Sequence, residues 1–233
     1  MLLSPLLTAS LLAVSGCGAT PRQPAPPAAP AARSTSPDAS PTQAGDGAPG
    51  RILPATSEPR QPGYTSPVQG PASYARTHHD YPASDVMAPC GATAVAVTDG
   101  VILEVNRVDT WNAKVDAGAT RGGLSVSLLG TDGVRYYGSH FSSIQAGIEA
   151  GTRVTSGQPI AKVGRTGDAG ACHIHFGISP PCAGVGDWWI RRGVIWPWPY
   201  LDAWRAHEPR TAVNEITAWK AANGCPTAPL AEP

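Results

Sequence analysis

Two histidines that alternate along one predicted strand are the residues in this sequence best suited to chemistry. They lie in the segment His173-Ile174-His175. Because alternate side chains of a strand point to the same face, His173 and His175 project together while Ile174 faces the core. Two imidazoles on one face can serve as two metal ligands, or as one ligand and one proton-transfer group. The alternative is a solvated strand face without a chemical role.

A second polar cluster lies earlier in the chain, where residues 77–85 read THHDYPASD. It supplies two histidines, His78 and His79, and two carboxylates, Asp80 and Asp85. Imidazole and carboxylate ligands together suit zinc. Three protein ligands leave a fourth position for water, which is the arrangement of a catalytic rather than a structural zinc site. The two clusters therefore predict a zinc centre that activates water.

Short β-branched runs alternate with Gly and Asp turns from about residue 67 onward. Asp99-Gly100 and Asp132-Gly133 each separate two apolar runs, a pattern typical of a β-hairpin. We therefore expect a mostly antiparallel domain of many short strands. The expected strands are residues 94–97, 101–105, 124–129, 134–137 and 173–178, with another pair around residues 154 and 160–163.

The sequence changes character at residue 187, after which lie six of its seven tryptophans. One helix is expected near residues 211–223, with Gly224 where a helix C-cap belongs. The whole pattern predicts an all-β dominated fold, with an antiparallel sheet domain of the barrel-sandwich kind at residues 67–186. The Trp-rich extension at residues 187–233 should wrap around and pack on this domain. Four of its tryptophans could line a substrate groove, but packing is favoured because Trp is usually largely buried. These four are Trp188, Trp189, Trp196 and Trp198.

The N-terminal part predicts export. Residues 1–17 form a short apolar segment that resembles a lipoprotein signal peptide, ending in a lipobox-like LAVSGC at Cys17. Cys17 would then carry a lipid that anchors the protein to the membrane; an ordinary secretory signal is the alternative. Residues 18–66 are rich in Pro and Ala, and they read as a disordered linker because they cannot bury enough apolar surface to order themselves. The protein should therefore face the cell wall, anchored or secreted.

Four cysteines remain when Cys17 is set aside, and an even number in an exported chain indicates two disulfides. Three pairings are possible. We favour Cys172–Cys182 with Cys90–Cys225, since each bond would close a wrapping segment onto the core.

Composition excludes several classes of protein. Lys plus Arg and Asp plus Glu number 17 each, so no basic field is available for nucleic acid. No apolar run reaches the roughly 18 residues of a membrane-spanning helix. The 26 Gly and 25 Pro also argue against a helix bundle or coiled coil.

Residues 79–178 resemble the LytM or lysostaphin-type zinc peptidases of family M23. That family carries a His…Asp motif, a lone His after a Tyr-rich strand and a His-x-His strand. Here these motifs read His79…Asp85, YYGSHF at residues 136–141 and CHIHFG at residues 172–177. The family's usual His-x-x-x-Asp spacing is stretched, with five residues between His79 and Asp85 and six from His78.

The resemblance implies that His79, Asp85 and His175 hold zinc, with His78 as the alternative to His79. It implies that His173 is the general base and that His140 orients or stabilises the oxyanion. The sixth histidine, His207, lies outside every motif and is expected at the surface.

The function that the resemblance implies is a cell-envelope zinc endopeptidase that hydrolyses peptide cross-links or stem peptides of peptidoglycan. Peptidoglycan peptides would be its partners, and a monomer is expected. The alternative is a non-catalytic LytM-like module that binds the wall or regulates another hydrolase, which would purify without stoichiometric zinc. A carrier domain of the biotinyl or lipoyl kind is disfavoured because Lys162 lies within an apolar run and not at a hairpin tip.

Overall fold

The structure is a computed structural model that describes residues 63–229. The predicted signal peptide, its Cys17 and the linker as far as residue 62 lie outside the described residues. Tyr64, which the sequence placed in the linker, already packs on the domain. Its ring stacks on Trp204 with centroids 5.4 Å apart, and its hydroxyl donates to Asp132 at 2.8 Å. The packed part of the chain therefore begins before residue 67.

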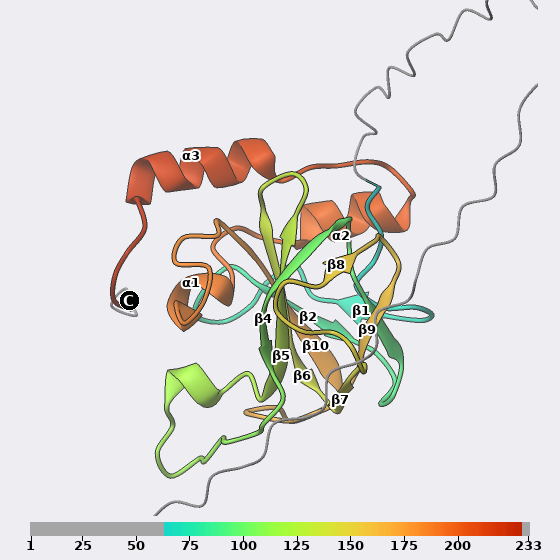
Figure 1. Ribbon diagram of the computed structural model, residues 1–233, viewed down its shortest axis with the longest axis vertical. Coiled ribbons are helices and arrows are strands. Elements are labelled where there is room, and N and C mark those ends of the chain that lie inside the picture. The colour runs from blue at the N-terminus through green and yellow to red at the C-terminus, as the bar shows by residue number, and fades with distance from the viewer. Residues whose placement is uncertain (1–62, 230–233) are drawn as a thin grey trace, which may run out of the picture. The chain divides into compact units, whose positions relative to one another are not determined.

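Antiparallel strands dominate the described chain, as the sequence predicted (Figure 1). In spatial order, the larger sheet consists of β1 (Ser73–Tyr74), β2 (Ser84–Met87), β10 (His173–Ser179), β6 (Arg135–Phe141), β5 (Leu124–Gly130), β4 (Gly100–Asn106) and β8 (Arg153–Val154). The smaller sheet consists of β3 (Thr93–Val95), β9 (Pro159–Lys162) and β7 (Ser143–Ile144). A short 3₁₀ helix, η1 (Gly118–Thr120), interrupts the long connection between β4 and β5.

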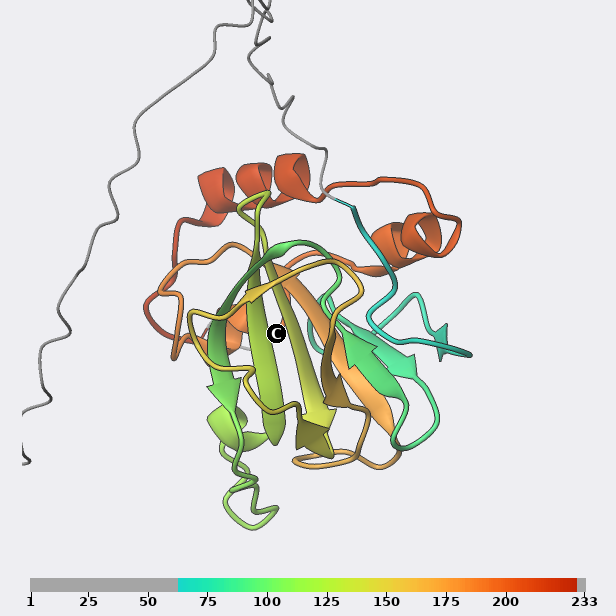
Figure 2. The same cartoon turned by 45° about the vertical axis from the view of Figure 1, so that its right-hand side comes forward.

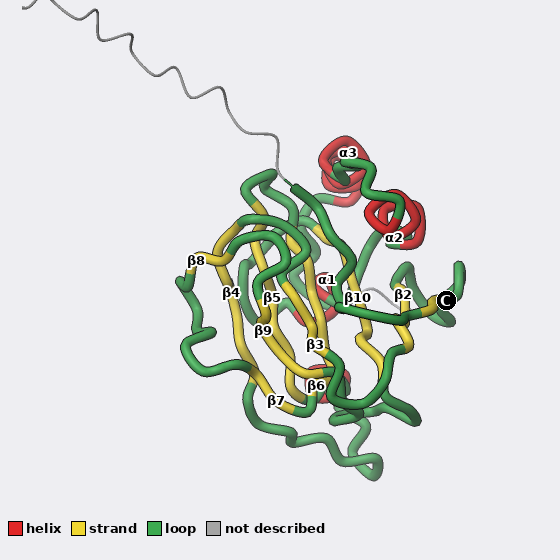
Figure 3. The backbone as a smooth tube through the Cα atoms, turned by 90° about the vertical axis from the view of Figure 1, so that its right-hand side faces the viewer, coloured by secondary structure: helices red, strands yellow, loops and turns green. Residues whose placement is uncertain are grey.

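The core lies where the two sheets pack against each other (Figure 3). Ala94 and Ala161 come from the smaller sheet, while Val126, Ile174 and Phe176 come from the larger one. Since Ile174 and Phe176 point into this core, the alternate residues of β10 must point to the opposite, outer face of the larger sheet. The predicted metal site is therefore carried on the face of β10 that points away from the smaller sheet.

The two Asp-Gly turns behave differently. Asp132-Gly133 closes the β5–β6 hairpin, in which Leu128 pairs with Tyr136, so that prediction is confirmed. The hairpin predicted at Asp99-Gly100 is wrong, because β3 pairs with β9 while β4 pairs with β5 and β8. The chain changes sheets at this corner, and the Asp99 carboxylate accepts a hydrogen bond from the Ser156 N–H at 2.8 Å. An Asp-Gly turn signal predicts that the chain reverses direction, but it does not predict which strand will pair with the strand that follows.

The C-terminal extension holds the predicted helix and two more. Helix α3 (Val213–Asn223) is the predicted one, and it ends at Gly224, whose φ of 66° suits glycine. The sequence did not predict α1 (Trp188–Arg191) or α2 (Trp198–Arg205). Helices α2 and α3 lie at the same end of the sheet in Figures 1 and 2, joined by a Tyr200 hydroxyl that donates to Glu215 at 2.6 Å. Among residues 63–229, no helix has both the length and the apolarity to cross a membrane.

Two disulfides form as expected, but the favoured pairing is wrong. The bonds are Cys90–Cys172 and Cys182–Cys225, with Cα atoms 5.3 and 5.5 Å apart. Cys90 follows β2 and Cys172 precedes β10, and these strands are antiparallel neighbours in which Met87 pairs with His173. Strand pairing therefore brings the two cysteines together, and this tertiary neighbourhood is not visible in the order of cysteines along the chain.

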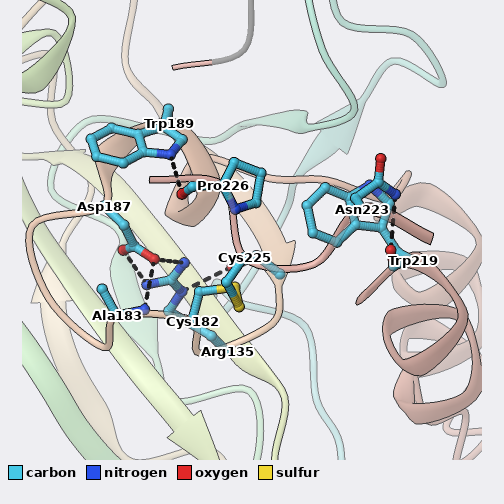
Figure 4. The surroundings of a disulfide bond; sticks show 10 residues. Arg135, Cys182, Ala183, Asp187, Trp189, Trp219, Asn223, Cys225 and Pro226 are labelled. Carbon is cyan, nitrogen blue, oxygen red and sulfur yellow. Dashed lines mark hydrogen bonds and ion pairs between the residues drawn. A yellow bond between two sulfur atoms is a disulfide. The ribbon is translucent and has the colours of Figure 1, made fainter. Parts of the chain in front are cut away.

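A buried ion pair holds the start of the extension against the sheet (Figure 4). The Arg135 guanidinium donates to both carboxylate oxygens of Asp187, at 2.5 and 3.0 Å, and also to the Ser179 hydroxyl at 2.9 Å. The Arg135 side chain is fully buried, and that of Asp187 is 3% exposed. Removing one partner of such a pair leaves the other charge buried and unpaired, which is costly.

We expect Arg135→Met to lower the free energy of unfolding by about 3–5 kcal/mol, because Asp187 would lose its only buried counter-charge among the described ion pairs. Arg153→Met, at an exposed arginine of β8, is the matched control and should stay within about 0.5 kcal/mol. Urea unfolding measures both variants. Equal effects of the two substitutions would contradict a stabilising role of the ion pair.

Candidate metal centre

Strand pairing places three of the predicted residues next to one another. On β10, His175 pairs with Asp85 of β2 on one side and with Ser139 of β6 on the other. His173 lies two residues earlier on the same outer face, as the sequence predicted. The shared face is not solvated, because loops and the extension cover it and His173 and His175 are 8% and 5% exposed. The alternative of an exposed strand face therefore does not hold.

Three side chains offer ligand atoms to one point: His78, Asp85 and His175. These atoms all lie within 4.8 Å of one another. The Asp85 Oδ1 atom is 3.2 Å from His175 Nδ1 and 3.8 Å from His78 Nε2. Tetrahedral zinc with bonds of about 2.0–2.1 Å holds its ligand atoms roughly 3.4 Å apart, so two imidazoles and a carboxylate at this spacing fit the ion.

The structure separates the two adjacent histidines. The side chain of His78 is 5% exposed and turned toward Asp85, whereas that of His79 is 77% exposed and lies 3.2 Å from Asp80. The sequence favoured His79, but the geometry groups His78 with the other donors. The His79 ring stacks on the His78 ring with centroids 4.3 Å apart, and the stretched spacing before Asp85 could not decide which of the two would face the carboxylate.

A backbone carbonyl orients each of the three remaining imidazoles. His175 Nε2 lies 2.9 Å from the Arg192 carbonyl, His173 Nδ1 lies 2.9 Å from that of Ala171, and His140 Nδ1 lies 2.8 Å from that of Thr166. A carbonyl can only accept, so these nitrogens carry the protons. The opposite nitrogens are His175 Nδ1, His173 Nε2 and His140 Nε2. Those of His175 and His173 lie 3.2 and 3.7 Å from the Asp85 carboxylate.

His140 reaches the site through an irregularity in β6. The β5–β6 register shifts between Leu124 and Val126, which is the signature of a β-bulge. His140 has a φ of 66°, an uncommon value for a residue other than glycine, and its N–H donates to the Gly122 carbonyl at 2.9 Å. The bulge turns its ring to within 4.6 Å of the His173 ring, measured between centroids.

The histidines open into a cleft of about 340 Å³. One wall is a stack in which the Arg192 guanidinium lies 3.9 Å from the Tyr81 ring and 5.3 Å from the Trp188 ring. Of the four tryptophans considered for a groove, Trp188 is the one among the cleft-lining residues. His207 lies exposed at the surface, as predicted.

Burial sets the charge state of the site. It lowers the pKa of His78 to about 4, with a further contribution from the charge of His175. It likewise lowers the pKa of His140 to about 4. Burial alone would raise the pKa of Asp85, but the hydrogen bond and charge of His175, with the charges of His173 and His78, outweigh it and lower that pKa to about 2. At neutral pH the site thus offers an ionised carboxylate at Asp85 and neutral imidazoles at His78 and His140, and carboxylates and neutral imidazoles are the forms that bind metals.

The model of Peptidase family M23 matches residues 79–185. Over these residues the chain is therefore similar to the M23 peptidases. The match includes Asp85, His140, His173 and His175, and it begins one residue after His78. The resemblance expected from the three motifs is therefore confirmed. A search of curated proteins found no match.

Solved structures similar to this chain share modest identity with it. The catalytic domain of the antimicrobial peptidase lysostaphin from Staphylococcus simulans is 23% identical, covering 60% of this chain and 89% of that chain at a TM-score of 0.41. A protein from Pseudomonas aeruginosa assigned to peptidase M23 is 22% identical, covering 60% and 50% at 0.44. One from Ruminococcus gnavus assigned as a glycyl-glycine endopeptidase LytM is 18% identical, covering 64% and 63% at 0.46. The present chain thus spans between half and two thirds of the latter two proteins.

Sequence analysis missed the parts of the candidate site that are backbone groups or that come from outside the three motifs. The carbonyl groups of Thr166, Ala171 and Arg192 carry no side-chain signal, so no residue pattern could have identified them. The Arg192–Tyr81 contact joins segments far apart in the chain. Only the aromatic content of the extension pointed toward the wall that Trp188 supplies.

Proposed function

We propose that the protein is an exported zinc endopeptidase that hydrolyses peptides of bacterial peptidoglycan. The observation that carries the proposal is the cluster of His78, Asp85 and His175, placed in an M23 domain beside two further imidazoles at the end of a cleft. A structural role would not require these additional imidazoles. Their presence favours hydrolysis over the alternative of a binding or regulatory module.

His78, Asp85 and His175 would hold Zn²⁺ through one atom each. When bound, the ion would act as a Lewis acid and lower the pKa of water at the site to about 7. Because three protein ligands are available, a fourth position would stay open to the cleft. The ionised Asp85 carboxylate offsets part of the ion's charge, and the neutral His78 ring presents a lone pair.

His173 and His140 would carry the proton and charge chemistry. His173 holds its Nδ1 proton against the Ala171 carbonyl, so Nε2 faces the cleft as a proton acceptor, the role of a general base. His140 is held in the same way by Thr166, and its Nε2 faces the same space. When protonated there, it would donate to the oxygen on which negative charge develops.

The substrate class and location follow from the family resemblance together with features of the chain. Two disulfides within residues 63–229 fit an oxidising compartment outside the cytoplasm. Residues 1–17 would direct export, and a lipid on Cys17 would hold the domain at the membrane. The Pro- and Ala-rich linker would let the catalytic domain reach wall peptides.

We expect His78→Ala to abolish stoichiometric Zn²⁺ binding, because two ligands remain from a set of three. His79→Ala is the matched control and should bind one Zn²⁺ per chain, since its side chain points to solvent. Elemental analysis after dialysis measures both variants. Loss of zinc in His79→Ala with retention in His78→Ala would overturn the assignment.

We expect His173→Ala to keep its zinc and to lose about 10²- to 10⁴-fold in turnover, the usual contribution of a general base. Release of muropeptides from purified peptidoglycan, followed by mass spectrometry, measures the rate and identifies the bond cut. His207→Ala is the control, because that histidine is exposed and outside the cleft. A His173→Ala protein that digests peptidoglycan at the wild-type rate would refute the base assignment. A wild-type protein that binds zinc without releasing fragments would support the non-catalytic module.

A further inference from the structure

The match to family M23 ends at residue 185, yet a later residue contacts the metal cluster directly. The Arg192 carbonyl accepts a hydrogen bond from His175 Nε2 at 2.9 Å. We propose that residues 187–193 are a positioning element of the metal centre, whose Arg192 carbonyl fixes the His175 ring so that Nδ1 faces His78 and Asp85. The proposed role in metal binding rests on the function proposed above. The contact between His175 and the Arg192 carbonyl, however, can be tested without any metal.

The segment runs along the outer face of two paired strands. On this face Arg135 pairs with Ser179 and Ser139 pairs with His175. Asp187 lies at the first pair, bound to the Arg135 guanidinium, and Arg192 lies at the second. Four residues of a strand separate the two ends, a distance of about 13 Å. The segment is therefore anchored at one end by the ion pair and delivers its carbonyl at the other.

Glycine at two positions permits the close approach. A Cβ atom on Gly177 would lie 2.3 Å from the Arg192 carbonyl oxygen and 2.5 Å from its carbon. Gly193 has a φ of 132°, and a Cβ there would lie 2.3 Å from the Pro82 carbonyl oxygen. Any side chain at Gly177 would displace the backbone group that binds His175. The absence of a side chain there is thus a requirement of this contact.

Main-chain pairing also holds the residues that follow Gly193, at the C-terminal end of the segment. Strand β2 pairs with β10 only as far as Phe176. Beyond that point the Val194 N–H donates to the Ile178 carbonyl at 3.0 Å, and Ile178 forms an isolated bridge with Ile195. The chain after Gly193 therefore takes over the edge of β10 where β2 stops. Arg192 is held between this pairing and the Asp187 ion pair, so its carbonyl has a defined direction.

Such a contact matters because a metal-binding imidazole must present the correct nitrogen. An acceptor on the opposite nitrogen fixes the tautomer and the ring orientation and makes the ligand more basic. Loss of partners of this kind typically costs 10- to 100-fold in metal affinity or activity. Asp85 contacts the other ring nitrogen, Nδ1, at 3.2 Å, so among the described hydrogen bonds it is the Arg192 carbonyl that restrains Nε2.

The first test needs no substitution in the segment. Long-range ¹H–¹⁵N spectra of the metal-free, ¹⁵N-labelled full-length chain report which ring nitrogen of each histidine carries a proton, with His175→Ala used for assignment. We expect a proton on His175 Nε2. An unprotonated Nε2 would overturn the proposal, whatever the protein's activity.

The second test perturbs the carbonyl. We expect Gly177→Ala to weaken Zn²⁺ binding about 10- to 100-fold, measured by competition with a chromophoric chelator, and to alter the His175 ring spectrum. Gly63→Ala is the matched control, since its Cβ would make only an ordinary 3.9 Å contact with Ser156. A folded Gly177→Ala protein with wild-type affinity and an unchanged His175 spectrum would refute the proposal. If Gly177→Ala does not fold, or if the wild-type chain binds no zinc, the ring spectrum of the wild-type chain decides alone.

Discussion

The register of β10 between β2 and β6 is the constraint on which the candidate metal centre depends. Side chains alternate along a strand, so the pairing that sends Ile174 and Phe176 into the core also sends His173 and His175 to the outer face. A slip of one residue would exchange the two sets and bury the imidazoles among apolar side chains. Hydrophobic burial therefore enforces the position of the site. The Cys90–Cys172 bond joins the ends of the same strand pair and opposes such a slip.

Strands set the positions of the imidazoles, but irregular backbone sets their directions. Three carbonyl groups outside regular strands each accept a hydrogen bond from one ring nitrogen, and each leaves the other nitrogen facing the cleft. The bulge at His140 serves the same purpose by turning a residue that regular pleating would aim elsewhere. A ring that a carbonyl already holds loses less rotational entropy when it binds a metal or transfers a proton. The site is thus prepared by protein contacts before any ligand arrives.

Local pattern was sufficient for the parts of this protein that are determined locally. Period-two alternation placed His173 and His175 on one face, and the turn residues identified the β5–β6 hairpin. The choice between His78 and His79 depends on how one loop lies over β10, and the cysteine pairing depends on which strands are neighbours. These are tertiary facts with no periodic signal. The role of the Arg192 carbonyl could not be predicted from the sequence at all, because every residue has a carbonyl group and only the fold decides where it points.

The buried Arg135–Asp187 pair attaches the extension at a large cost in desolvation free energy, which attachment alone would not require. Apolar side chains of similar volume often stabilise a protein as well or better, because they avoid the cost of desolvating two charges. Apolar contacts, however, have no preferred direction, and a segment held by them can slide along a sheet. The guanidinium fork binds the carboxylate through two hydrogen bonds and therefore fixes both place and orientation. Since Arg192 follows five residues later and must meet a single nitrogen of His175, we infer that directionality is the reason for a charged anchor.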